Sequence, residues 1–466
     1  MTSPLVSDPD FPSLKSLVID TTGMAFYADK DDDLARIVSE RMATIGSPTC
    51  AHYLACLGDG GRGKEEMDAL VAELTIGETY FFRHKEQFDA LKERILPDVI
   101  ARNRSARRIR IWSAGCATGP EPYSIAIMLK REFGVQIAGW HVSIIGTDIN
   151  QKFLARARDG RYDDWAFRAT PDSVREECFT KVGRQWQIRP EYKAWVSFQY
   201  HNLTRNRFPS ILDNIAGFDI IICRNVVIYF SPETIQRLVP CFRETLVDGG
   251  WLVMGHAEPN QDLFRSFQTV NVPGAVLYQR IDHPQPAPAS IRPPAMPAAP
   301  VAVPDKAKPI QVRKPLAPTP LPVAAPPGPV AAPAHGEISA LRDLADRGQW
   351  EEAIKACDRL IEMNSLDAKL HFYRALVLEQ LGDNDESERS LRRAIYLDRH
   401  FVLPHYHLGL FLWRKDERDA ALRSFRNVLA LLERFADDHP FTDGDDITAG
   451  QLRETVGMHL KLIGAS

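Results

Sequence analysis

Several patterns that would indicate other kinds of protein are missing from this sequence. The seven cysteines of the 466-residue chain form no CxxC pair and have no metal-ligand spacing, so we expect neither a disulfide framework nor a metal site. No run of about 18 apolar residues occurs, and the first segment, MTSPLVSDPDFPSL, has neither the basic nor the apolar part of a signal peptide. We therefore expect a cytoplasmic protein that does not insert into a membrane.

An excess of positive charge is also missing. The formal net charge is -4 and the isoelectric point is about 6.4. Domains that bind nucleic acid usually carry a basic face or stripe, so this balance argues against nucleic acid as a partner. Hydrophobic residues make up 44% of the chain and charged residues 25%, which is normal for globular protein, and the length predicts two or three domains.

The clearest boundary is a Pro/Ala-rich linker at residues 282–335, which contains about half of the 33 prolines and no Phe, Trp or Tyr. Such a segment cannot bury enough apolar surface to fold, and it predicts an extended, partly polyproline spacer. A role as a ligand for SH3-like domains is the weaker alternative, because folded patterns flank the segment on both sides. A spacer of this kind predicts that the unit behind it moves independently.

Behind the linker, residues 336–466 carry a helical pattern that repeats about every 34 residues. Small residues recur at one position of the repeat, and an apolar residue follows each of them four positions later: Ala353, Ser387 and Ala421, then Cys357, Leu391 and Phe425. This period, with small residues where helices pack closely, resembles the tetratricopeptide repeat. Stacked repeats form a concave surface suited to a peptide or helix, so we expect a protein partner of unknown identity there; a cap for oligomerisation or solubility is the alternative.

Before the linker, the pattern changes from helical to alternating. Residues 1–95 predict a helical domain, in which the stretch DDDLARIVSERM carries apolar residues on one helix face. From Arg108 onward the apolar runs RIRIWSAG, HVSIIGTDI, FDIIICRN and GGWLVMG alternate with helical stretches. This alternation predicts an α/β domain at residues 96–281 with a doubly wound, mostly parallel sheet.

Polar residues follow these apolar runs, at the strand ends where open α/β sheets bind ligands. The clusters contain Gly115, Gly119 and Glu121; Asp148; Asn202 with Leu203; and Arg224, Asn225 and Tyr229. Taken singly, each has an ordinary structural explanation as a turn or a cap. Together they favour a nucleoside-bearing ligand, with Asp148 accepting hydrogen bonds from ribose hydroxyls. A carboxylate at Glu121 would repel a phosphate and favours a cationic ligand such as S-adenosylmethionine.

The stretches ELTIGETYFFRHKEQFDAL, RIWSAGCATGPEPYSIAI, IIGTDIN, FDIIICRNVVIYF and LVDGGWLVMGHAE resemble the motifs of the chemotaxis-receptor methyltransferases, the CheR family. The resemblance runs from about Phe11 to Tyr278. It implies a Rossmann-like methyltransferase sheet with an N-terminal helical domain and a small β subdomain at about 162–198. Together with the all-α repeats, it is similar to the methyltransferases of alternative, Wsp-type chemosensory pathways.

The resemblance also implies the chemistry. S-adenosyl-L-methionine would be the methyl donor, S-adenosyl-L-homocysteine the product, and glutamate side chains on the cytoplasmic helices of methyl-accepting chemoreceptors the acceptors. The residues that it places around the donor are Thr79, Arg83, Gly115, Glu121, Asp148, Asn202, Leu203, Arg224 and Asn225. Arg83, Arg224 and Tyr229 would be catalytic. One departure is Gly77, where some members have an asparagine that contacts the donor.

The absence of an acid-base pair agrees with this reaction. A glutamate side chain, with an ordinary pKa of about 4.3, is ionised at neutral pH and needs no general base. The enzyme would act by aligning the reactants and excluding water. Two alternatives remain open: a pseudoenzyme that binds S-adenosylmethionine and signals through its repeats, and a methyltransferase for a small acid or another protein.

Overall fold

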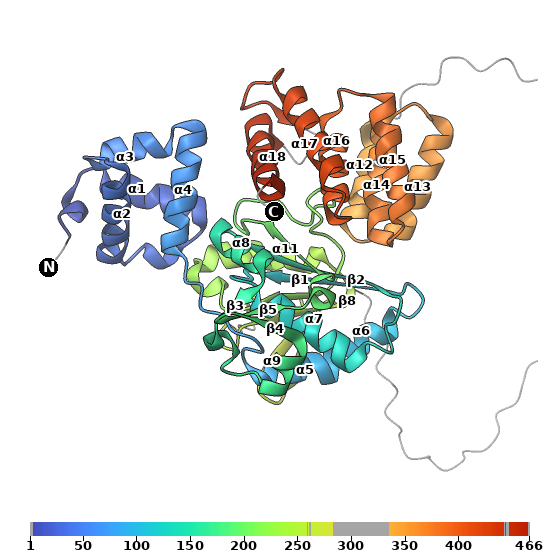
Figure 1. Cartoon of the computed structure of the whole chain (residues 1–466), viewed down its shortest axis with the longest axis horizontal. Helices are drawn as coiled ribbons and strands as arrows, with labels where there is room; N and C mark the ends of the chain where they lie inside the picture. Colours follow the sequence, from blue (N-terminus) through green and yellow to red (C-terminus); the bar gives the residue numbers. More distant parts are fainter. Residues whose placement is uncertain are drawn as a thin grey trace, which may run out of the picture.

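The computed structural model describes residues 3–258, 260, 262–282, 335–441, 443 and 447–464. The predicted linker lies almost wholly outside the described residues. Figure 1 shows three folded parts: N-terminal helices, a central sheet covered by helices, and a C-terminal array of paired helices.

The N-terminal part is a small helical unit that stands to one side of the sheet (Figure 1). Its elements are η1 (Pro4–Ser7), α1 (Phe11–Thr22), η2 (Ala25–Tyr27), α2 (Asp31–Ile45), α3 (Cys50–Leu57) and α4 (Gly60–Leu74). The apolar face expected for α2 is buried: Leu34, Ile37, Val38 and Met42 all pack into the core of this unit. Three aspartates occupy the first turn of α2, where the helix dipole favours negative charge.

The central sheet has seven strands in the order β6-β2-β1-β7-β8-β10-β9. The strands are β1 (Arg108–Ala114), β2 (His141–Asp148), β6 (Val196–Tyr200), β7 (Phe218–Cys223), β8 (Leu246–Met254), β9 (Gln268–Val272) and β10 (Ala275–Gln279). The first five strands in this order pair in parallel, and β10 pairs antiparallel with both β8 and β9. The predicted doubly wound, mostly parallel fold is therefore confirmed.

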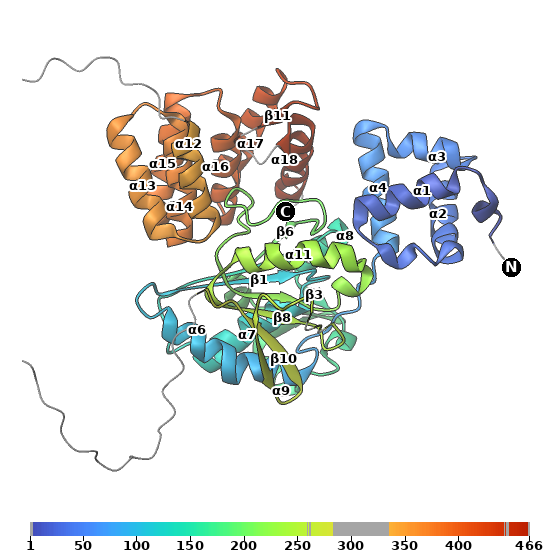
Figure 2. The same ribbon diagram turned by 180° about the vertical axis from the view of Figure 1, so that it is seen from behind.

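Alternate residues of the central strands point to opposite faces, and helices cover both. On one face, Ile109 and Ile111 share a core with α5 (Lys85–Ala90), η3 (Leu91–Ile95), α6 (Leu96–Arg102) and α7 (Pro120–Phe133). On the other face, Trp112 and Ala114 share a core with α11 (Pro232–Thr245), which lies across the sheet in Figure 2. Helix α8 (Gln151–Asp159) contacts β2 and β6. The segment before residue 95 thus contributes both a separate helical unit and part of the core of the sheet.

A small antiparallel sheet follows β2, as the family resemblance implied. Its strands lie in the order β3-β5-β4 and are β3 (Arg161–Tyr162), β4 (Phe179–Val182) and β5 (Gln185–Ile188). Three short helices accompany it: η4 (Asp164–Phe167), α9 (Asp172–Cys178) and α10 (Pro190–Lys193). Phe81, from the segment between α4 and α5, packs among the aromatic rings of this subdomain and anchors that segment.

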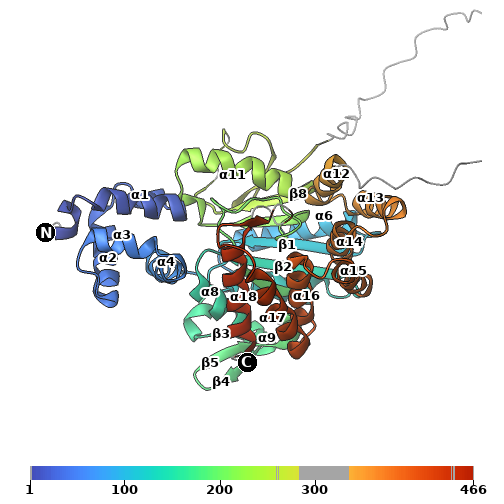
Figure 3. The ribbon, with the colours of Figure 1, turned by 90° about the horizontal axis from the view of Figure 1, so that it is seen from above.

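The C-terminal part consists of three antiparallel helix pairs and a last helix, which form a curved row in Figure 3. The pairs are α12 (His335–Asp346) with α13 (Trp350–Met363), α14 (Ala368–Leu381) with α15 (Asn384–Leu397), and α16 (Val402–Arg414) with α17 (Arg418–Leu432). Strands β11 (Pro440–Phe441) and β12 (Ile447–Thr448) precede α18 (Ala449–Gly464). Ala353, Ser387 and Ala421 are fully buried, as the repeat pattern predicts, and the tetratricopeptide-like architecture is confirmed.

The repeats pack on the sheet domain, so the expectation that they move independently is wrong. Ile211, Leu212 and Ala216, between β6 and β7, lie in the apolar core of the repeats. An ion pair of 3.2 Å joins Arg108 on β1 to Glu351 on α13. Proline-rich composition describes only the linker, and it carries no information about whether the flanking domains bury apolar surface against each other.

Candidate active site

The carboxyl ends of the parallel strands β2, β1 and β7 meet at one edge of the sheet, because neighbouring strands run in the same direction. The turn that begins at Gly115 leads from β1 into α7 at Pro120. The backbone N–H groups of Gly115 and Cys116 both donate to the carbonyl oxygen of Thr147 on β2. This turn is therefore fixed against the end of β2, beside Asp148.

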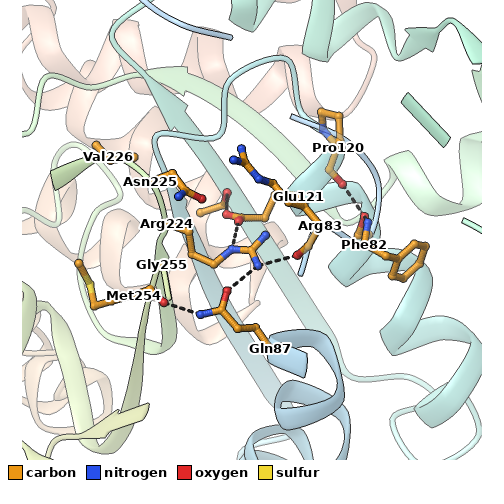
Figure 4. A network of polar contacts seen from close by, with 12 residues as sticks. Phe82, Arg83, Gln87, Pro120, Glu121, Arg224, Asn225, Val226, Met254 and Gly255 are labelled. Carbon is orange, nitrogen blue, oxygen red and sulfur yellow. Dashed lines mark hydrogen bonds and ion pairs between the residues drawn. The ribbon is translucent and has the colours of Figure 1, made fainter. Parts of the chain in front are cut away.

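A buried ion pair between Glu121 and Arg224 lies at the centre of this edge (Figure 4). Arg224 Nε donates to Glu121 Oε2 at 2.7 Å, and Ser113 Oγ donates to Glu121 Oε1 at 2.6 Å. The side chains of Arg224 and Glu121 are only 4% and 11% exposed. The Glu121 carboxylate is thus already paired within the chain, whereas the sequence suggested a carboxylate that meets a cationic ligand directly.

The second half of the same network connects Arg224 to the segment before α5 (Figure 4). Arg224 Nη1 donates to the carbonyl oxygen of Arg83 at 2.7 Å and to Gln87 Oε1 at 2.9 Å. Gln87 Nε2 in turn donates to the carbonyl oxygen of Met254 at the end of β8, at 2.6 Å. Gln87 is 1% exposed. Arg224 therefore fixes the backbone of Arg83, and Gln87 is a structural member of the site that the sequence reasoning missed.

Asp148 lies at the carboxyl end of β2 and accepts two backbone hydrogen bonds. Ala117 N donates to Oδ2 at 2.9 Å, and Asn150 N donates to Oδ1 at 2.8 Å. Burial raises the pKa of Asp148 to about 6, and the amide hydrogen bonds oppose that rise. Asn150 also caps α8 and donates to Thr75 Oγ1 at 2.7 Å, which attaches the end of α4 to this edge.

The side chain of Asn202 is engaged inside the protein. Its Nδ2 donates to the carbonyl oxygen of Thr21 in α1 at 2.8 Å, and its Oδ1 accepts from the backbone and the hydroxyl of Thr204. Leu203 is 8% exposed and packs in the same core as Trp112. The structural explanation, in which Asn202 fixes a loop, therefore describes its observed contacts.

Arg83 and Tyr229 come from distant parts of the sequence, and Arg83 lies near enough for its charge to act on the Tyr229 phenol. Arg83 Nη1 donates to the carbonyl oxygen of Glu78 at 2.6 Å, and the guanidinium lies 5.7 Å from the centre of the Tyr80 ring. Tyr229 ends η5 (Val227–Tyr229), and its ring meets Phe26 of the N-terminal unit edge-on at 5.8 Å. Burial raises the pKa of Tyr229, and the nearby positive charge of Arg83 opposes that rise.

The remaining candidates lie beside these groups. Thr79 is half-buried in the segment that leads to Arg83. Asn225 has φ +59°, and its backbone N–H donates to Glu258 Oε2 at 3.0 Å. At Gly77, a β-carbon would lie 2.5 Å from Cζ of Phe153, so the Phe153 ring fills the space that the asparagine of other members would need.

Two further groups of residues escaped the sequence reasoning. Glu258 accepts hydrogen bonds from the backbone N–H groups of Asn225, Val226 and Gly255, and so joins the loops after β7 and β8. The rings of His84 and His256 lie tilted against each other with their centres 4.7 Å apart. Burial lowers the pKa of His84, and the positive charges of Arg224 and Arg83 lower it further. The only signal for both groups was their position inside the motif stretches ELTIGETYFFRHKEQFDAL and LVDGGWLVMGHAE.

The polar side chains of the site suit an organic ligand better than a metal ion. Among the residues that the structure describes, no cluster of three or more His, Cys, Asp or Glu side chains could hold a metal ion. Arg83 Nε and His84 Nε2 are buried and have no hydrogen-bond partner in the described part of the chain. These atoms, with the buried carboxylate of Asp148, fit a ligand that carries several hydrogen-bonding groups. No helix within the described ranges is both long enough and apolar enough to span a bilayer.

Comparisons with known proteins agree with this geometry. The family model for the CheR methyltransferase, SAM binding domain, matches residues 77–276. The chemotaxis protein methyltransferase of Listeria monocytogenes is 34% identical over 192 residues, which cover 41% of this chain and 69% of that protein. That of Borreliella burgdorferi is 34% identical over 256 residues, covering 54% and 89%. The probable biofilm formation methyltransferase WspC of Pseudomonas aeruginosa is 28% identical over 405 residues, covering 84% and 91%.

The doubly wound sheet with polar strand ends is thus the catalytic domain of an S-adenosylmethionine-dependent methyltransferase. The chain belongs to the CheR family, and it is a chemoreceptor glutamate O-methyltransferase with tetratricopeptide-like repeats at its C-terminal side.

Proposed function

We propose that this methyltransferase forms glutamate methyl esters on the cytoplasmic helices of receptors in a Wsp-type chemosensory pathway, where the esters serve adaptation. Support for this pathway comes from the similarity to WspC, which extends over both the catalytic domain and the repeats. The chain's own residues support the chemistry, because Arg83 and Arg224 provide positively charged orienting groups at the strand ends.

We further propose that the donor lies at the carboxyl ends of β1, β2 and β7, where Asp148 would accept hydrogen bonds from its ribose. Glu121 and Arg224 would support this site as a neutral pair, since each satisfies the other's charge. The remaining residues proposed to line it are Thr79, Arg83, Gly115, Asn202, Leu203 and Asn225. For Asn202 the proposed contribution comes from the loop that it fixes, because its amide group already bonds Thr21 and Thr204.

The observation that carries the proposal is the placement of Arg83 beside the buried Glu121–Arg224 pair, since Arg224 binds the carbonyl oxygen of Arg83 and also pairs with Glu121. When bound, S-adenosylmethionine supplies an activated methyl group. Arg83 would orient the acceptor carboxylate, which is ionised at neutral pH. Since burial raises the pKa of Tyr229, its phenol stays protonated and can donate a hydrogen bond to an oxygen near the reacting atoms. The packed aromatic segment around Phe81 would limit the entry of water.

The test is transfer of labelled methyl from S-adenosylmethionine to the cytoplasmic domains of receptors from the same cell, followed by mild base. We expect label on the receptor that base releases, as for an ester. Arg83→Ala should reduce the transfer strongly, and the matched control Lys85→Ala, on an exposed side chain two residues away, should not. Donor binding without any base-labile label on a receptor would contradict the proposal and favour the sensor alternative.

A further inference from the structure

The loop between β6 and β7, residues 201–217, touches all three folded parts of the protein. Near its start, Asn202 bonds Thr21 of the N-terminal unit, and Leu203 packs against the sheet. Further along the loop, Ile211 and Leu212 are buried among the helices of the repeats. The loop therefore connects the proposed donor site directly to the repeats.

The repeats hold this loop through a buried carboxylate at the end of α12. Asp346 Oδ1 accepts a hydrogen bond from the backbone N–H of Ile211 at 2.7 Å. Asp346 Oδ2 lies 3.7 Å from Arg342 Nε and 3.9 Å from Arg207 Nη2. Asp346 is 4% exposed and Ile211 is 2% exposed, so water cannot easily replace this bond.

Close backbone packing reinforces the same contact. Gly217 and Gly348 have φ of +62° and +73°, and a β-carbon on Gly217 would lie 2.8 Å from Cα of Gly348. That β-carbon would also lie 2.3 Å from Cζ2 of Trp350, a fully buried side chain of α13. The two backbones approach so closely that a side chain on either glycine would not fit. Both surfaces therefore depend on glycine at this contact.

The start of the loop has anchors of its own, so a disturbance at Ile211 would not simply unfold it. Phe208 packs edge-on against Trp112 of β1 with ring centres 5.3 Å apart. The N–H of Asn202 donates to Asn206 Oδ1 at 2.8 Å. Only two residues separate Phe208 from Ile211, whose N–H donates to Asp346. A shift of Ile211 is therefore transmitted to Phe208 through this short stretch.

We propose that the repeats form part of the methyltransferase site by holding the loop of residues 201–217, with Asp346 as the positioning residue. This inference rests on the proposed donor site at Asn202 and Leu203. Asp346 touches neither reactant and acts through the Ile211 backbone. Removing its carboxylate leaves the Ile211 N–H buried without an acceptor and lowers the fraction of molecules whose loop can bind the donor.

The test compares Asp346→Ala, Asp346→Asn and the matched control Asp343→Ala, which removes an exposed carboxylate from the same helix. Binding of S-adenosylhomocysteine is measured by calorimetry on the full-length chain, and KM for donor and for receptor are measured separately. We expect Asp346→Ala to weaken binding by about fivefold or more and to raise the donor KM, with the receptor KM unchanged. Asp346→Asn keeps an acceptor oxygen and should restore most of the affinity, and Asp343→Ala should match the wild type.

A measurement on the wild-type chain covers the case in which Asp346→Ala does not fold. Coupling between two sites is reciprocal, so S-adenosylhomocysteine should slow amide hydrogen exchange at Ile211 and in helix α12 as well as at Asn202. Wild-type affinity in Asp346→Ala, equal losses in the Ala and Asn variants, or unchanged exchange in α12 would each overturn the inference. Failure of the wild type to bind S-adenosylhomocysteine at all would instead refute the proposed function, on which the inference rests.

Discussion

Replacing Arg224 tests whether the Glu121–Arg224 pair stabilises the strand ends. Its side chain makes three hydrogen bonds, to Glu121 Oε2, Gln87 Oε1 and the Arg83 carbonyl oxygen. Arg224→Met fills a similar volume and removes all three donors. Because the side chain of Glu121 is only 11% exposed, its charge would stay buried without a positive partner, and only the Ser113 hydroxyl would still donate to it. Breaking a buried ion pair in this way costs about 3–5 kcal/mol.

The partner variant Glu121→Gln keeps the shape of the side chain and leaves Arg224 charged and buried, so we expect a loss of about 3 kcal/mol. The double variant contains neither charge. Its loss should be smaller than the sum of the two single losses by about 2 kcal/mol or more, as for residues in one network. Arg36→Met is the matched control, because the Arg36–Glu40 pair is more than 60% exposed on both sides and should contribute less than about 0.5 kcal/mol.

The assay is urea unfolding of the full-length variants without donor, followed by circular dichroism, with midpoints compared at a common slope. A loss for Arg224→Met no larger than that for Arg36→Met would refute the argument, and so would strict additivity of the two single losses. Either result would mean that the hydrogen bonds of Arg224 do not determine the stability of this edge of the sheet.

Three further predictions concern the donor, the chemistry and the repeats. Asp148→Ala should weaken S-adenosylmethionine binding by about 1.5–3 kcal/mol, and an unchanged affinity in the folded variant would remove Asp148 from the site. In the wild type, the affinity measured by calorimetry should fall from pH 7 to pH 5, because a carboxyl group whose pKa is raised to about 6 gains its proton in that range. Tyr229→Phe and Arg83→Ala should lower kcat more than donor affinity, because the loss falls on the transition state, and wild-type turnover in both would indicate packing roles. A chain ended after Asp282 should bind donor more weakly than the full chain and melt at a lower temperature, because Ile211 and Leu212 become exposed; equal binding would show that the repeats serve only to recruit partners.

Sequence reasoning reached the strand ends because their pattern is local. An apolar run followed by a polar residue placed Asp148 at the end of β2 and Arg224 after β7. The same reasoning missed Gln87, Glu258 and the His84–His256 contact. Their partners come from segments far away in the chain, and no local period records which side chains will meet. The proposed roles of the site residues stay predictions that the experiments above address.

Asn202 and Glu121 show a second limit of predicting the site from the sequence. Their positions after strands suggested direct contact with a ligand, and the tertiary structure gives each of them partners inside the chain. A carboxylate at the start of a helix can attract a ligand cation or an arginine side chain. Which of these it meets depends on the neighbouring loops, and here Arg224 reaches Glu121 from the end of β7.

The sequence by itself determined the class of fold, the family and the repeat architecture, because hydrophobic periodicity and motif spacing depend on residues that are close together in the sequence. Only the tertiary structure decided how the parts combine. Ile211, Asp346, Gly217 and Gly348 lie in different predicted domains, and none of them forms a recognisable motif with the others. Their contact depends on two folded surfaces that fit each other, which is a property of shape in three dimensions.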